Sequence, residues 1–197
     1  AIPQVGPSTY LVGTVSGELI RYNSLSEFDY NDLSLDASVY QILTPRVYGR
    51  LGWRHQQLFS TNDGNRFLNN HALYLALGRR DRLESNLKLD TAYQVSLNFA
   101  DPDTRSRLIN ALGTTLTYEV TPDLDASLGY QFNWVQFSEQ DRRDVSHRVI
   151  ATLSYQVSEG STVSLFGGFR QGTSSEATID FNGALFGAQW TVNLPLF

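Results

Sequence analysis

Apolar and polar residues alternate one by one along most of the chain. The clearest segment is 87–99, where every second residue from Leu87 to Phe99 is apolar or aromatic apart from one threonine, and the residues between are polar or small. The segments 124–134 and 145–157 repeat the pattern. A period of two is typical of β-strands whose two faces meet different surroundings, and no segment sustains the 3.6-residue period of a helix. The pattern predicts an all-β protein.

The alternating segments divide the chain into about ten expected strands. They cover residues 9–22, 29–43, 46–58, 70–79, 87–99, 106–120, 124–137, 145–157, 162–171 and 178–194. Tight separators at 44–46, 80–86, 121–123 and 158–161 alternate with more open, polar separators at 23–28, 59–69, 100–105, 138–144 and 172–177. This alternation predicts consecutive antiparallel hairpins. We expect one domain, 1–197, with residues 1–8 as a short N-terminal segment.

A degenerate repeat at a spacing of roughly 39 residues supports this order. Tyr40, Tyr118 and Tyr155 each begin a stretch that runs through a turn into a new strand. Tyr40 departs from the parity of Tyr118, which predicts a β-bulge close to Tyr40.

Composition narrows the class of protein. The 197 residues include no Cys and no Met and carry a formal net charge of −5. The lack of Cys excludes disulfides and thiolate metal sites, and the acidic balance argues against a nucleic-acid partner. A transmembrane helix, which needs about 20 apolar residues in a row, is excluded. The missing initiator Met predicts a mature chain from which a signal peptide has been removed.

Alternation alone fits either a soluble β-sandwich or barrel, or a membrane barrel with its apolar face toward lipid. Strands of about 10 to 15 residues exceed the usual globular length and suit a tilted bilayer crossing. Short turns alternating with longer loops, and aromatic side chains near strand ends, are typical of transmembrane barrels. The expected aromatic girdle consists of Trp53, Tyr93, Phe99, Tyr118, Tyr130, Trp134, Tyr155, Phe169 and Trp190. We therefore favour a single up-and-down antiparallel transmembrane β-barrel, with the soluble fold as the alternative.

The chain resembles Gram-negative outer-membrane β-barrel proteins along its whole length. The stretch 118–170, with its Tyr-x-Val-Thr and Tyr-x-Val-Ser turns, is similar to small porin-like families. The resemblance implies a location in the bacterial outer membrane, contact with its lipids and passage through the barrel-assembly machinery. Phe197 resembles the terminal aromatic residue of the signal that this machinery reads, but it is out of phase with Trp190. A shifted signal around 187–192 stays open.

The polar face of such a barrel lines its lumen. It carries five acids and five bases: Glu18, Asp36, Arg50, Arg54, Lys88, Asp90, Glu119, Asp125, Arg148 and Arg170. Charges away from bulk water are costly unless paired, so we expect a network of ion pairs. About ten strands enclose little more space than the eight that side chains fill, which predicts a narrow or plugged lumen.

Catalytic chemistry has weak support in the sequence. Ser146 and His147 are neighbours near Asp144, but adjacent residues of a strand point to opposite faces and cannot readily share a proton. No metal or cofactor site is expected. We favour a non-enzymatic structural or anchoring barrel, acting with an envelope protein partner in a larger assembly. A small porin or channel for ions or small solutes is the alternative, and a rim-located hydrolase is a third candidate.

Overall fold

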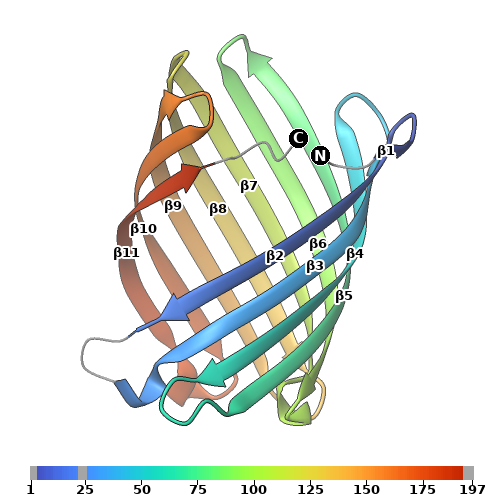
Figure 1. Ribbon diagram of the computed structural model, residues 1–197, viewed down its shortest axis with the longest axis vertical. Coiled ribbons are helices and arrows are strands. Elements are labelled where there is room, and N and C mark those ends of the chain that lie inside the picture. Colours follow the sequence, from blue (N-terminus) through green and yellow to red (C-terminus); the bar gives the residue numbers. More distant parts are fainter. Residues whose placement is uncertain (1–3, 22–25, 193–197) are drawn as a thin grey trace.

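The computed structural model describes residues 4–21 and 26–192, which form one antiparallel sheet curved into a barrel (Figure 1). Within these residues, eleven strands follow one another in chain order. They are β1 (Gln4–Gly6), β2 (Thr9–Ile20), β3 (Tyr30–Ile42), β4 (Val47–Ser60), β5 (Arg66–Glu84), β6 (Leu87–Asp101), β7 (Arg107–Thr121), β8 (Leu124–Phe137), β9 (Arg143–Ser158), β10 (Ser161–Ser174) and β11 (Phe181–Val192). The prediction of an all-β, up-and-down antiparallel fold is confirmed.

The ten long strands correspond to the ten that the sequence predicts, and the short β1 pairs with β2. The tight turns lie at the upper end in Figure 1 and the longer loops at the lower end. The loops contain single 3-10 turns: η1 (Ser26–Phe28), η2 (Asp103–Arg105) and η3 (Ala177–Ile179). None of the helices that the structure describes is long and apolar enough to cross a membrane.

Strand β5 is longer than predicted, because it continues through positions 80–84, which the sequence analysis assigned to a turn. The register of β5 and β6 explains the difference. Arg80 lies opposite Asp90, and its Nε is 3.0 Å from the carboxylate. Cross-strand pairs of opposite charge stabilise a sheet, so the hairpin extends beyond the first residue of β4.

The two faces of the sheet differ in the way that the alternation predicts. Leu73, Leu75 and Leu77 on β5 are 53%, 56% and 54% exposed, whereas the intervening Ala72 and Tyr74 are each 3% exposed. Water-soluble proteins rarely expose large apolar side chains in continuous rows. This outward apolar face is the lipid-facing surface of a transmembrane barrel.

The bulge predicted near Tyr40 is wrong. Strand β3 pairs with β2 and β4 without a register shift. Tyr40 points inward and stacks on Tyr48, with ring centroids 5.2 Å apart, whereas Tyr118 points outward. A register irregularity lies instead near Tyr118, in β7 between Glu119 and Thr121.

Strands β2 and β11 are the borders of the long-strand order (Figure 1). Within residues 4–21 and 26–192, no backbone pairing joins β2 to β11. The outer edge of β11 therefore has no described partner strand, and that of β2 is paired only at Thr9 and Tyr10, by β1.

Candidate functional site in the barrel lumen

The pairing register places all ten predicted lumen charges at inward positions. It brings together Asp36 with two arginines, and Lys88 with Glu119 at 3.4 Å. Glu18 and Asp125 form no ion pair with a residue that the structure describes. The network is therefore divided into local clusters.

Asp36 is the centre of the most connected cluster. It accepts hydrogen bonds from Arg50 Nη2 at 2.8 Å, from Arg54 Nη2 at 3.1 Å and from the Tyr74 hydroxyl at 2.8 Å. The Asp36 side chain is only 11% exposed. Arg50 and Arg54 also lie over the Tyr74 ring, 5.5 and 5.6 Å from its centroid. Glu18 and Asp32 line the same inward wall, so three carboxylates accompany the two guanidinium groups there and the wall carries no excess of positive charge.

Arg80, toward the turn end, is a further inward charge that the predicted strands did not include. The guanidinium lies over the inward-facing Tyr48 ring, 5.0 Å from its centroid, while it pairs with Asp90. The parity of β5, continued from Tyr74 through Gly78, would have placed Arg80 inward. The assignment of 80–86 to a turn hid that signal.

A different arrangement occupies the wall formed by β8, β9 and β10. Arg148 and Arg170 lie directly opposite each other, and neither pairs with an acid in the described part of the chain. Arg148 donates a hydrogen bond to Gln131 Oε1, and Arg170 lies 5.6 Å from the centroid of the Phe181 ring. Like charges directly opposite each other destabilise a sheet. A cavity of about 250 Å³ adjoins the two arginines and is also lined by Asn133 and Ser146.

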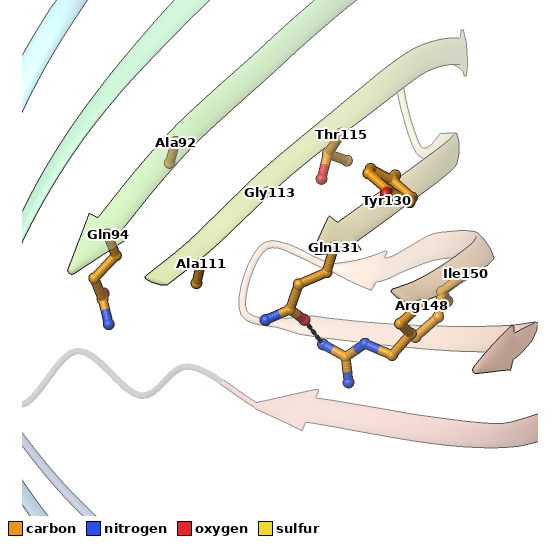
Figure 2. Close-up of a pocket in the computed structure, with 10 residues that line it drawn as sticks. Ala92, Gln94, Ala111, Gly113, Thr115, Tyr130, Gln131, Arg148 and Ile150 are labelled. Carbon is orange, nitrogen blue, oxygen red and sulfur yellow. Dashed lines mark hydrogen bonds between the residues drawn. The ribbon is translucent and has the colours of Figure 1, made fainter. Parts of the chain in front are cut away.

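A second cavity, of about 340 Å³, lies beside the small inward residues of β6, β7 and β8. Figure 2 shows Ala92 and Ala111 on one side of this space, and Arg148 with its hydrogen bond to Gln131 on the other. Alanine and glycine side chains at these positions are too short to fill the interior. The inner wall of the barrel is therefore hollowed at these positions.

The charged side chains of the described residues do not form a single network across the lumen. Arg54, Lys88 and Asp90 side chains keep 48%, 46% and 45% of their surface exposed. The reason is geometric, because the ion pairs join neighbouring strands along the wall and do not cross the interior. Asp36 pairs from β3 to β4, and Lys88 pairs from β6 to β7.

The residues considered for catalysis are held apart. Ser146 points inward, where its Oγ is 3.3 Å from Asn133 Nδ2, whereas His147 points outward with its Nδ1 2.8 Å from the Tyr130 hydroxyl. Asp144 is engaged by Arg142 in a two-fold contact at 2.9 and 2.6 Å. The hydrogen bonds to Asp144 raise the pKa of the Arg142 guanidinium in the loop above its ordinary value. Residues 4–21 and 26–192 contain no group of three or more His, Cys, Asp or Glu that could hold a metal ion.

The predicted girdle residues all lie at outward positions. Trp134 is half-buried, and the other eight are exposed. Trp190 donates a hydrogen bond from Nε1 to Ser161 Oγ at 2.7 Å. Phe197, the other residue of the expected assembly signal, lies outside the described residues. An outward aromatic ring with a polar group suits the border between lipid and water.

No protein-family model matches this chain, and no curated protein sequence matches it either. Solved structures do share its fold. The KdgM porin is 16% identical with a TM-score of 0.54, covering 94% of this chain and 91% of the porin. LpxR from Salmonella typhimurium is 11% identical with a TM-score of 0.57, covering 98% and 86% of the two chains. Outer-membrane expressed OmpT of Vibrio cholerae is 10% identical with a TM-score of 0.54, covering 94% and 59%. These similarities show that the chain has the fold of an outer-membrane β-barrel.

Proposed function

We propose that this protein is a non-enzymatic channel of the bacterial outer membrane that conducts small organic anions. The observation that carries the proposal is the inward-facing pair Arg148 and Arg170, which has no acid partner in the described part of the chain. A protein gains no stability from two facing cations. Such a pair is useful where an anion passes or binds, because guanidinium groups match carboxylates in shape and charge.

The opposite wall carries no such excess of positive charge. Glu18, Asp32 and Asp36 line it together with Arg50 and Arg54, and Arg80 is paired with Asp90, so the selectivity for anions rests on Arg148 and Arg170. Rings of charged side chains select ions in pores, and a charged wall raises the local concentration of the opposite ion. The hollow beside Ala92 and Ala111 provides space for a hydrated solute.

A structural neighbour suggests the class of solute. One solved structure similar to this chain, at 15% identity and a TM-score of 0.51, is a KdgM porin in complex with disordered oligogalacturonate, a polymer of acidic sugars. Recognition of carboxylate groups is the part of this chemistry that Arg148 and Arg170 of the present barrel favour. The proposed solutes are small molecules that carry carboxylates.

Planar-bilayer recording of the purified barrel tests the proposal. We expect stepwise openings and, in a KCl gradient, a reversal potential that indicates preference for chloride. R148Q and R170Q should reduce this preference, while R79Q should leave it unchanged, because Arg79 points outward and pairs with Asp81. A barrel that inserts without stepwise conductance would contradict the channel.

A structural role in a larger envelope assembly is the second candidate. It is favoured by the outer edge of β11, which has no described partner strand, and by that of β2, which β1 pairs only at Thr9 and Tyr10. Unpaired backbone groups are costly in hydrocarbon, so such edges call for pairing. Failure to conduct, together with co-purification of one envelope protein in fixed ratio, would favour this role. Hydrolase activity that is lost in H147A and D144A would contradict both non-enzymatic candidates.

A further inference from the structure

A pocket of about 500 Å³ lies at the loop end of the barrel, apart from the lumen arginines. We call it the mouth pocket. Its walls come from η1, from β3, β4 and β5 at their loop ends, and from η2. The residues that define it are Glu27, Phe28, Tyr30, Leu58, Phe67 and Arg105.

A break in the strand register builds the aromatic wall of this pocket. Leu58 pairs with Leu68 and Phe59 pairs with Arg66, so Phe67 is an extra residue without a partner on β4. A bulge of this kind redirects a side chain, and bulges are frequent beside functional sites. The Phe67 ring meets the Tyr30 ring edge-to-face at 6.0 Å and 88°.

The aromatic wall is open to water. Phe28 is 61% exposed and Phe67 is 39% exposed, and both line the mouth pocket. Exposed aromatic surface forgoes the free energy that burial would provide. A bound molecule that covers these rings would recover it.

Two opposite charges flank the rings without meeting. Glu27 belongs to η1 and Arg105 to η2, and both line the mouth pocket. Neither side chain forms an ion pair or a side-chain hydrogen bond with a residue that the structure describes. The other acid of the pocket, Asp29, lies 3.9 Å from Arg21. A pocket lined by an unpaired anion, an unpaired cation and aromatic rings is suited to a ligand that carries both charges.

We propose that the mouth pocket binds a small zwitterion, with an organic ammonium group at one end and a carboxylate at the other. The ammonium group lies against the rings of Phe28, Tyr30 and Phe67 beside Glu27, because aromatic faces and carboxylates both attract compact organic cations. The carboxylate reaches Arg105, whose guanidinium pairs well with it. This ligand class differs from the simple anions proposed for the lumen.

Titration calorimetry on the purified barrel in detergent micelles tests this site, with glycine betaine as the probe. We expect saturable binding of the zwitterion that is about tenfold tighter than binding of choline, which lacks the carboxylate, or of acetate, which lacks the cation. Because the readout is binding and not conductance, failure of the proposed channel would leave this test intact.

Three variants examine the two ends and the wall of the pocket. R105Q should bring betaine binding down to the level of choline, and E27Q and F67A should each weaken it about fivefold or more. The matched controls are R82Q, E84Q and F99A, which change the same residue types outside the pocket. A difference in electrophoretic migration between the unheated and the heated sample verifies folding of every variant. The proposal would be overturned if choline and betaine bound equally well, or if betaine showed no saturable binding. It would also be overturned if the three control variants weakened betaine binding as much as the three pocket variants do.

Discussion

Arg148 and Arg170 face each other across β9 and β10 on the inner wall of the barrel, and neither pairs with an acid in the described residues. The two facing cations are unfavourable for folding and favourable for binding an anion. An anion bound between the two arginines would therefore offset their repulsion and stabilise the folded barrel.

A carboxylate that binds the arginine pair should stabilise the barrel. With citrate at ten times its dissociation constant, we expect the free energy of unfolding to rise by about 1.4 kcal/mol, since citrate binds only the folded state. Urea titration in micelles, followed by tryptophan fluorescence, measures the change. R148Q and R170Q should abolish it, and an equal gain in both variants would contradict the site.

D36N should destabilise the barrel strongly. The substitution removes the charge of a carboxylate that is only 11% exposed and leaves Arg50 and Arg54 without their shared partner, which we expect to cost about 2–4 kcal/mol of unfolding free energy. The matched control is D90N, whose ion pair with Arg80 is exposed and should contribute less than about 1 kcal/mol. Urea unfolding of both variants gives the comparison, and equal losses would refute the central role of Asp36. In a conducting barrel, D36N should also increase the preference for anions.

G52A should disturb the same cluster from a neighbouring strand. A Cβ at Gly52 would clash with the Tyr74 ring and with the Ser38 side chain, so Tyr74 must move away from Asp36. We expect a loss of about 1–3 kcal/mol, as for other overpacked sites. G113A is the control, because a Cβ at Gly113 meets nothing within 4 Å. If both variants unfold at the same urea concentration, the predicted clash is absent.

L75R should test which face meets lipid. Leu75 is outward and 56% exposed, so an arginine there would enter hydrocarbon, and we expect a loss of about 2–4 kcal/mol in refolded vesicles. Q94R places the same side chain on the inward face of β6 and should be tolerated. Reversal of this order, measured by urea unfolding in the same vesicles, would mean that the faces are assigned incorrectly.

The sequence alone determined the fold class and the face on which each strand residue lies. The side-chain period of a strand is a local property, so the alternation around Leu97 and Asn98 separates the outward from the inward face without knowledge of any partner strand. Arg148 and Arg170 could both be placed inward for this reason. The strand ends were harder to predict, because the length of β5 depends on pairs such as Arg80 with Asp90 that form only in the hairpin.

Tertiary structure alone decided which inward residues meet. Cross-strand neighbours are set by the hydrogen-bond register of strands that can be far apart in sequence, and a shift of one residue changes every pair. That register places Asp36 between Arg50 and Arg54, turns Phe67 into the mouth pocket, and leaves the interior hollow where ion pairs follow the wall. The inward charges read from the sequence give the composition of the lumen. The distances between those charges, and therefore their chemistry, are set only when the strands pair and the sheet curves.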